Sequence, residues 1–469
     1  MTNPFVIDPS SPIPIYFQLK TVLLEQIGSG HYGPADRLPT EQQLCEMLGV
    51  SRTPVHRALA ELADEGVVIR RRRTGTFVNP EWRAEDVRVS VLVTEEKWVR
   101  ALASLSPEGI TVDVGMSASL PHLHDYLTDL VGRGEAPDIA LLDSVWVTEF
   151  ARSGFIVPLD VVDPEWVDSI VRPEVVPRLV ESLTVGGHLY AVPEEANVSG
   201  VWYRRDVLEG HAPPATWDDL WTVLVNAGDL VFAGGTLGGE TTTYWLAGWL
   251  ASNGVEILSD SAVLLDSSAA TEAMRYLRRL VDAGVVDAKV VGLEWDRPPV
   301  LLAEGAAGAS FGGSYEAGTL ARLAGVDLDS LSSRFVFGPF PAGPSGAAAS
   351  VLGGMVYVVF RQSEHPAAAV RLLRHILDPE VLGKRSRGEP TVPPLREARD
   401  ELAGQVRFVG ATAALVDIAV ARPAVENYSM VSAQLQRMVE SVLTGRTGPA
   451  AAVERTAEML SAITGLPRR

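Results

Sequence analysis

The spacing of apolar residues in the first eighty positions is the feature that most restricts how this chain folds. Residues 14–27 place apolar side chains at every third or fourth position, which predicts a helix. A second, short helix is predicted between Thr40 and Gly49, because Thr40 and Gln43 form a capping-box pattern and Gly49 is a helix-ending residue. Two helices within fifty residues indicate a small domain of their own.

A third helix and a change of period complete this domain. Ser51 is a favourable N-cap for a helix that runs to Gly66. After Gly66 the pattern changes to short runs at residues 67–70 and 76–78, which predict the two strands of a hairpin. Three helices followed by a hairpin predict a winged helix-turn-helix over residues 1–80, a fold whose third helix enters the major groove of DNA.

Polar and cationic residues gather where this fold would meet DNA. The first turns of the third helix would present side chains to base edges, and these side chains are Ser51, Arg52, Thr53 and His56. Cationic side chains beside that helix would hold phosphates, and these are Arg57 and the run Arg70–Arg73. A run of arginines alone is a solvated surface as often as a DNA contact. Its place on the predicted hairpin, which is the wing of this fold, favours DNA contact.

The charge of the chain is divided unevenly. The chain has 469 residues, long enough for two or three domains, and a net charge of −19. Residues 1–85 are nearly neutral, so almost all of the negative charge lies in the remainder. Because an acidic body repels phosphates, nucleic-acid contact is expected only from the cationic cluster of the first domain. The one cysteine, Cys45, is predicted to be a small core residue.

Ordered blocks in residues 12–80 resemble the DNA-binding domain of GntR-family regulators. These blocks are Pro14, Tyr16 and Gln18, then Asp36–Glu41, then Val50–Leu59, and finally Glu65–Gly66 with Gly75–Val78. The resemblance implies that Arg37, Ser51 and Arg52 contact DNA. Gln42 and His56 stand where the family often has arginine, so the operator is expected to be atypical. The predicted DNA-contacting set is Arg37, Gln42, Ser51, Arg52, Thr53, His56, Arg57, Arg72, Arg73 and Gly75.

The rest of the chain alternates strands with helices. Residues 81–87 are predicted to form a linker. Apolar runs that read as strands lie at residues 87–93, 110–114 and 139–142. Longer amphipathic segments follow at Ala269–Ala283 and Pro366–Leu377. This alternation predicts an α/β fold with a mostly parallel sheet.

Six ordered segments of this body resemble family 1 extracellular solute-binding proteins, the carbohydrate-binding components of ABC importers. The segments are residues 137–159, 188–221, 302–315, 335–361, 388–397 and 422–428. The resemblance implies an α/β domain over residues 88–469 with the two-lobed fold of type II periplasmic binding proteins and a ligand cleft between its lobes. Lobe 1 would comprise about residues 88–193 and 354–392, and lobe 2 about residues 194–353 and 393–469.

The same resemblance places candidate ligand contacts on the segments that border the cleft. They are Asp143, Ser144, Trp146, Asn197, Thr242, Tyr244, Tyr315, Gly354 and Met355. A sugar needs flat apolar faces for its C–H surfaces and directional polar groups for its hydroxyls, and this set offers both. For any one aromatic residue here, packing in the core is an equally good interpretation.

Two other function classes compete with a ligand-responsive regulator. GntR-type heads are also fused to aminotransferase-like domains, but the only lysines for a pyridoxal Schiff base are Lys20, Lys97, Lys289 and Lys384, and none is suitably placed. The other alternative is a solute-binding protein of an ABC transport system with no DNA-binding role. The His122-x-His124-Asp125 sequence lacks further metal ligands, so a loop and helix start is expected there. No metal, cofactor or catalytic residue is predicted.

The start of the chain and its hydropathy bear on location. We find no basic and apolar leader and no apolar run of transmembrane length, so a cytoplasmic protein is expected. The sequence predicts a regulator that binds double-stranded operator DNA as a homodimer and responds to a small polar effector, expected to be a sugar.

Overall fold

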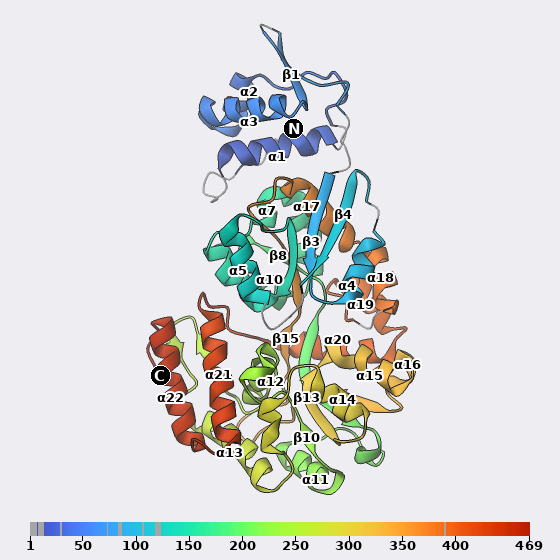
Figure 1. Ribbon diagram of the computed structural model, residues 1–469, viewed down its shortest axis with the longest axis vertical. Helices are drawn as coiled ribbons and strands as arrows, with labels where there is room; N and C mark the ends of the chain where they lie inside the picture. The colour runs from blue at the N-terminus through green and yellow to red at the C-terminus, as the bar shows by residue number, and fades with distance from the viewer. Residues whose placement is uncertain are drawn as a thin grey trace.

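The computed structural model describes residues 7, 14–28, 31–72, 74–82, 87–105, 107–117, 123–388 and 391–469. Figure 1 shows three bodies stacked along the long axis, with the N-terminal domain at one end, a first α/β lobe in the middle and a second lobe at the other end. Each body has its own cluster of buried apolar residues. In these ranges no helix combines the length and apolar character needed to cross a membrane.

The N-terminal domain has the predicted order of three helices and a hairpin. Its elements are α1 (Ile15–Gly28), α2 (Glu41–Leu48), α3 (Arg52–Asp64), β1 (Val68–Arg71) and β2 (Gly75–Val78). The capping box is confirmed, because the Thr40 hydroxyl accepts from the Gln43 amide and the Gln43 side chain accepts from the Thr40 amide. Gly49 ends α2 in the left-handed region, with a φ of 65°. Leu44 and Leu59 are fully buried, so the domain is held by its own core.

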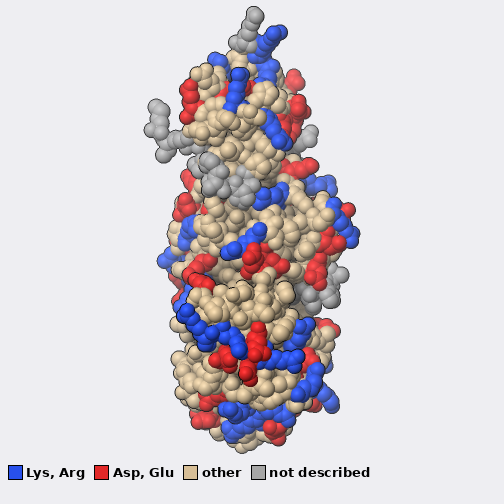
Figure 2. All heavy atoms as spheres, turned by 90° about the vertical axis from the view of Figure 1, so that its left-hand side faces the viewer, with Lys and Arg blue, Asp and Glu red and all other residues tan. Residues whose placement is uncertain are grey.

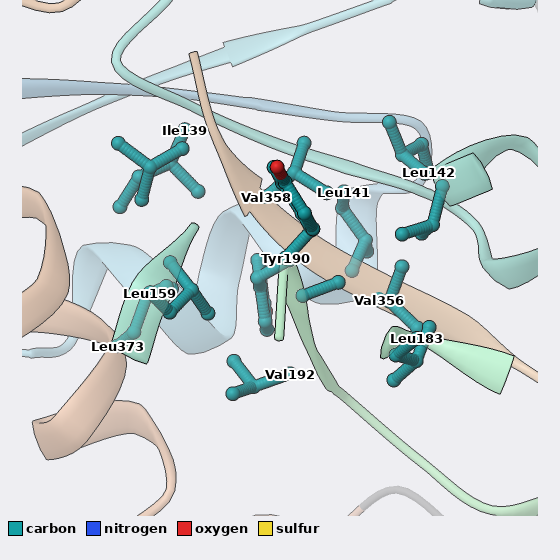
Figure 3. Packing of buried hydrophobic residues seen from close by; sticks show 14 of the residues in the cluster. Ile139, Leu141, Leu142, Leu159, Leu183, Tyr190, Val192, Val356, Val358 and Leu373 are labelled. Atoms are coloured by element: carbon teal, nitrogen blue, oxygen red, sulfur yellow. The ribbon is translucent and has the colours of Figure 1, made fainter. Parts of the chain in front are cut away.

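Lobe 1 is built on a five-stranded sheet in the order β4-β3-β5-β16-β8. Its strands are β3 (Val87–Val93), β4 (Ile110–Met116), β5 (Ile139–Asp143), β8 (Ala191–Pro193) and β16 (Met355–Val359), and a hairpin is formed by β6 (Thr184–Val185) and β7 (His188–Leu189). Strands β4, β3 and β5 are parallel, whereas β16 is antiparallel to both of its neighbours. The helices are α4 (Glu96–Ala103), α5 (Leu123–Arg133), α6 (Val147–Arg152), α7 (Leu159–Val162), α8 (Pro164–Trp166), α9 (Arg172–Glu174), α10 (Pro177–Ser182), α17 (Pro366–Ile376) and α18 (Pro379–Gly388). Figure 3 shows Leu141, Val358 and Val192 of the sheet in one apolar cluster with Leu373 of α17.

Lobe 2 is built on a sheet in the order β10-β13-β9-β15-β17, with β14 also paired to β9. The strands are β9 (Asn197–Arg204), β10 (Leu230–Val231), β13 (Ala309–Gly313), β14 (Phe335–Gly338), β15 (Val351–Gly353) and β17 (Val420–Ala421), with a hairpin of β11 (Leu258–Ser259) and β12 (Ala262–Val263). The helices are α11 (Trp217–Ala227), α12 (Glu240–Ala251), α13 (Ser268–Asp282), α14 (Arg297–Ala303), α15 (Ala317–Ala324), α16 (Leu328–Leu331), α19 (Arg396–Ala403), α20 (Arg407–Ile418), α21 (Tyr428–Leu443) and α22 (Pro449–Thr464).

The expectation of mostly parallel sheets is wrong for lobe 2. Strand β9 is antiparallel to β13, β14 and β15. The reason is that β9 enters from lobe 1 and runs away from the hinge, whereas β13 and β15 run toward it. For the same reason β16, which returns from lobe 2, is antiparallel to β5 in lobe 1. A chain that crosses between two sheets therefore introduces one reversed strand into each.

The hinge consists of adjacent segments that cross between the lobes. The chain passes from β8 to β9 through Glu194–Ala196 and returns from β15 to β16 through Gly354. Strands β9 and β15 pair beside the hinge, with Asn197 opposite Gly353. Gly354 has a φ of 142°, and a Cβ atom there would lie 2.6 Å from the carbonyl oxygen of Glu195. Only glycine therefore fits at the return crossing.

Helix α1 is shared between the N-terminal domain and lobe 1. It packs against α7 and α17, directly below it in Figure 1. Phe17 of α1 packs on the apolar cluster of lobe 1, and Gly28 at the end of α1 lies beside Arg371 of α17. The N-terminal domain is therefore seated on lobe 1 and is not held by the connecting segment alone.

Candidate functional sites: the DNA-reading face and the interlobe cleft

The start of α3 presents an exposed polar face. Ser51 precedes α3 as its N-cap with an extended backbone, but its side chain makes no capping hydrogen bond. Its hydroxyl is therefore not committed to the helix. Ser51, Arg52, Thr53 and His56 are all exposed. The four residues predicted to read bases thus lie together on the open side of the domain.

A single carboxylate holds two arginines on this face. Glu41, the first residue of α2, accepts from Arg52 Nε at 2.9 Å and from Arg70 Nη2 at 2.5 Å. Burial would raise the pKa of Glu41, but the hydrogen bond from Arg52 and the two positive charges outweigh burial and lower it. The Arg52 side chain remains 80% exposed, so its guanidinium is oriented and still open to DNA. Sequence reasoning missed Glu41 as a site residue, although it ends the block Asp36–Glu41.

Arg37 lies at the base of the wing against Gly75. Gly75 opens β2 with a φ of 123°, and a Cβ atom there would lie 2.9 Å from Arg37 Nε. The backbone of Arg37 also forms a β-bridge with Phe77. The structure thus brings two predicted DNA-contacting residues together, and the absence of a side chain at Gly75 is what makes room for Arg37.

Replacing Gly75 with alanine is expected to displace Arg37 and weaken operator binding several-fold. The substitution also strains the backbone, because alanine disfavours positive φ, at a cost of about 1 kcal/mol. Gly66→Ala is the matched control, since Gly66 has a φ of 72° but no heavy atom within 4 Å of an added Cβ. Both variants should lose stability in thermal melts, and only Gly75→Ala should lose DNA affinity by fluorescence anisotropy. Equal losses of affinity in both variants would contradict this assignment.

Arg57 is held on the domain's own surface. Its Nε lies 3.0 Å from Glu61 Oε1 one helical turn away, and its guanidinium lies 3.6 Å from the ring centre of Tyr16. Tyr16 belongs to α1, so Arg57 links α3, the predicted recognition helix, to the helix that packs on lobe 1. Its predicted role in phosphate contact stays a prediction.

The remaining predicted DNA contacts lie around the same face. Gln42 is exposed and donates to Glu46 at 2.9 Å. Arg72 is exposed on the wing, and Arg73 lies outside the described residues. Figure 2 shows blue lysine and arginine side chains at the free end of the domain, with red acidic side chains on its flanks. This end is the cationic surface that the charge distribution of the sequence predicts.

A cleft of about 1150 Å³ lies between the two lobes. Seven of the nine predicted ligand residues line it: Asp143, Trp146, Asn197, Tyr244, Tyr315, Gly354 and Met355. Asp143 ends β5 and pairs with Met355 at the start of β16, and Tyr315 follows the end of β13. Six of the seven lie on strand ends or hinge segments, which meet at this one edge of each sheet, and Tyr244 comes from α12.

The structure places the other two predicted ligand residues away from the cleft. Ser144 is buried and lines a second, small cavity together with Arg178 and Leu352. Thr242 is fully buried, and its hydroxyl donates to the carbonyl oxygens of Ala233 and Gly235 at 2.9 and 2.8 Å. Its neighbour Thr241 lines the cleft instead. We therefore replace Thr242 with Thr241 in the candidate site and omit Ser144.

Arg422 bridges the two lobes beside the cleft. Its Nη2 donates to Asp143 of lobe 1 at 2.9 Å, and its Nη1 donates to Glu240 of lobe 2 at 2.6 Å. Tyr428 also donates to Glu240, at 2.5 Å. Burial raises the pKa of Glu240, and Arg422 opposes that rise. Sequence reasoning missed Arg422 and Glu240, although Arg422 opens the segment at residues 422–428 that carries part of the resemblance.

Asn197 lies at the hinge side of the cleft with both ends of its amide engaged. Its Nδ2 donates to Glu195 Oε1 at 2.6 Å, and its Oδ1 accepts from Ser314 Oγ at 2.9 Å. The amide thus joins the first crossing segment to the turn that carries Tyr315. Its predicted role toward a ligand stays a prediction, and its structural role is to fix Glu195.

A second polar contact joins the lobes through His124. Its Nε2 lies 3.0 Å from Glu149 Oε1 of α6, and Ser429 Oγ of α21 in lobe 2 donates to Glu149 Oε2 at 3.2 Å. Burial would lower the pKa of His124, but Glu149 and Asp125 outweigh burial and raise it. His122 lies outside the described residues, and within them no group of three or more side chains could hold a metal ion.

The raised pKa of His124 predicts a pH-dependent contribution to stability. The contribution is fully present below the unfolded-state pKa of about 6.5 and is lost as the pH rises through the higher folded-state value. The melting temperature of His124→Gln should therefore fall furthest below that of the wild type near pH 6 and approach it near pH 8.5. His211→Gln, which changes an exposed histidine, is the control. A deficit that grows with pH would refute the assignment.

Two families match this chain in separate regions. Residues 15–78 match the bacterial regulatory proteins of the gntR family. Residues 123–382, more than half of the chain, match the bacterial extracellular solute-binding protein family. The chain belongs to this solute-binding family. It carries a GntR-type DNA-binding domain at its N-terminal end, as the ordered sequence blocks predict.

Curated relatives divide in the same way. A "Probable ABC transporter-binding protein" of Deinococcus radiodurans is 28% identical over 312 residues, which cover 62% of this chain and 72% of that protein. The HTH-type transcriptional regulator YurK of Bacillus subtilis is 41% identical over 81 residues, which cover 17% of this chain and 34% of YurK. The chain thus spans only about a third of that regulator.

Solved structures show the fold of the two lobes. A solute-binding protein from Thermotoga lettingae bound to alpha-D-tagatose superposes with a TM-score of 0.72 at 21% identity and covers 81% of this chain and all of that chain. Maltose-bound MalE3 of T. maritima gives a TM-score of 0.71 at 24% identity, covering 80% of this chain and 99% of the other. The body therefore has the two-lobed fold predicted from the sequence.

The combination of domains favours one function class. A GntR-type domain fused to a solute-binding domain supports a ligand-responsive regulator, and a transport component without a DNA-binding role is less supported. Neither family is defined by an enzymatic activity.

Proposed function

We propose that this protein regulates transcription by binding operator DNA through α3 and the wing, and that its interlobe cleft senses a sugar or a similar small polar solute. The observation that carries the proposal is the seat of α1 on α7 and α17, because it makes the DNA-reading domain part of lobe 1. Lobe closure on a ligand is a two-state hinge motion. A movement of lobe 1 relative to lobe 2 therefore carries the N-terminal domain with it.

The composition of the cleft supports a sugar-like effector. Trp146, Tyr244 and Tyr315 offer aromatic faces, and Thr241 and Asp143 offer polar groups among them. Flat faces combined with directional polar groups suit a polyhydroxylated ligand. The sugar-bound structures with the same fold are consistent with this class of ligand.

Regulation would act through a homodimer in the cytoplasm, where operator DNA is found. A dimeric winged helix-turn-helix depends on the spacing of its two recognition helices. Closure of lobe 2 onto lobe 1 would change how two chains pack and hence this spacing. The effector shifts operator affinity only by its differential affinity for the open and closed states.

The proposal is tested in two steps with the full chain. A thermal-shift screen against sugars and polar solutes identifies a stabilising ligand, since a ligand that binds the folded state raises the melting temperature. Operator binding is then titrated with and without that ligand at fixed salt. Tyr315→Ala should weaken the ligand at least tenfold, whereas Tyr126→Ala, an exposed tyrosine on α5, should not. An operator affinity that is unchanged by a bound ligand would rule the mechanism out.

A further inference from the structure

The charges that line the cleft do not balance. Within the described residues, nine carboxylates and four cationic side chains line it. Three of the cations already lie beside cleft carboxylates: Lys97 is 3.3 Å from Glu95, Arg100 is 4.0 Å from Glu96, and Arg422 bridges Asp143 and Glu240. The fourth cation, Arg322, is exposed on α15. The cleft therefore keeps an excess of negative charge after its own ion pairs are formed.

Glu195 is one of the carboxylates left over. It is only 3% exposed and lies on the first hinge crossing. Its Oε1 accepts from Asn197, but its Oε2 is buried without a hydrogen-bond partner among the described residues. Burial raises the pKa of Glu195, with Glu95 adding to the rise while Lys97, Asn197 and Arg385 oppose it. A buried carboxylate with an unused oxygen is costly unless a bound group compensates it.

Glu316 is the second carboxylate left over, on the opposite lobe. It is also 3% exposed, and its carboxyl lies against the bare backbone of Gly312 and Gly313. Neither oxygen reaches a hydrogen-bond partner in good geometry, and no ion pair is present for it within the described ranges. Burial raises the pKa of Glu316 to about 8, with only the Gly313 backbone hydrogen bond opposing. Without a ligand this carboxyl is therefore largely protonated near pH 7, and a cation bound beside it would favour the ionised form.

Two aromatic rings line the same cleft as these two carboxylates. The Tyr244 and Tyr315 rings are 6.4 Å apart, and both line the cleft. Tyr244 already makes a cation–π contact within the protein, because the Arg422 guanidinium lies 4.9 Å from the centre of its ring. An aromatic face backed by carboxylates attracts an ammonium group through both the ring quadrupole and the net charge. A neutral sugar gains the ring contact and hydrogen bonds, but it does not compensate the charge of the carboxylates.

We propose that the effector of this cleft is a cationic polyol, such as an amino sugar, whose ammonium group is held on the side of Glu195 and Glu316. This inference rests on the proposed function and narrows its ligand class. Hydroxyl groups can hydrogen-bond to a carboxylate but cannot neutralise its charge, whereas an ammonium group does both. A metal ion is not the cation indicated by this negative charge, because no three of the described carboxylates lie close enough together to hold one.

The experiment compares pairs of ligands that differ in one group. The full-length protein is titrated calorimetrically at low salt with glucosamine against glucose, galactosamine against galactose, and the β-1,4 glucosamine disaccharide against cellobiose. The amine is expected to bind at least tenfold more tightly in at least one pair. Glu195→Gln and Glu316→Gln should each reduce that preference to about threefold or less. Glu454→Gln, the same change on the exposed side of α22, should leave it intact.

Each other outcome overturns the inference in a recognisable way. Binding of the hydroxyl partner as tightly as its amine, or no binding of any amine, rejects a cationic effector but leaves the sugar-sensing proposal standing. If spermidine, a cation without hydroxyl groups, binds as tightly as the best amino sugar, the polyol part of the proposal is wrong. An amine preference that survives both glutamine substitutions rejects the assigned carboxylates. A bound amine that leaves operator affinity unchanged refutes the regulatory mechanism and not the ligand class.

Discussion

Replacing Arg422 with methionine is expected to lower the free energy of unfolding of the two lobes by about 3–5 kcal/mol. The guanidinium is 3% exposed and is the cation that contacts both Asp143 and Glu240, so its removal leaves two largely buried carboxylates without compensation. Methionine retains the bulk of the side chain, which limits any cavity. Urea unfolding followed by tryptophan fluorescence measures mainly the effect on the lobes, since nine of the ten tryptophans lie in them and only Trp82 packs on the N-terminal domain.

Two further variants show whether charge is the cause. Arg446→Met removes an arginine that also pairs with a glutamate but is 63% exposed, so it should change the free energy of unfolding by no more than about 1 kcal/mol. Adding Asp143→Asn and Glu240→Gln to Arg422→Met should restore at least half of the loss, because the uncompensated charges are gone. If Arg422→Met unfolds at the same urea concentration as the wild type, the bridge does not hold the lobes.

Replacing Arg52 with alanine is expected to weaken operator binding by about 1–3 kcal/mol, or roughly 5- to 150-fold. The side chain stands at the exposed start of the recognition helix and is held there by Glu41. Its removal takes away the predicted base contact and also frees part of the Glu41 charge, which then repels phosphates. Fluorescence anisotropy at fixed salt measures the loss, with an operator selected by the wild-type protein from random duplexes.

The control for Arg52 separates specific contact from total charge. Lys289→Ala removes one positive charge from a side chain that is 91% exposed on lobe 2, and it should leave operator affinity within about twofold of the wild type. Arg52→Ala should also lose affinity more for the selected operator than for random DNA. An equal loss of affinity for the selected operator and for random DNA would indicate that Arg52 contacts phosphates and not bases.

Local patterns in the sequence were enough to predict the DNA-binding domain. The capping box on Thr40 and the left-handed Gly49 depend on neighbours three or four positions away, and the structure confirms both. The strand at residues 87–93 has the predicted bounds because its apolar run is short and well delimited. In lobe 2 the same reasoning failed, since no local pattern records that β9 arrives from another lobe and runs in reverse.

Which polar groups act together depends on how distant parts of the chain pack in space. Thr241 and Thr242 are adjacent in sequence, but neighbouring residues on a helix point about 100° apart, so one lines the cleft and the other is buried. Arg422 meets Asp143 across 279 positions of chain. Residue patterns and family resemblance predicted the domain types, the short elements and seven of the residues that line the cleft. The partners of its buried charges were decided by the tertiary structure, because ion pairing and desolvation depend on distance and burial in space, which residue spacing does not encode.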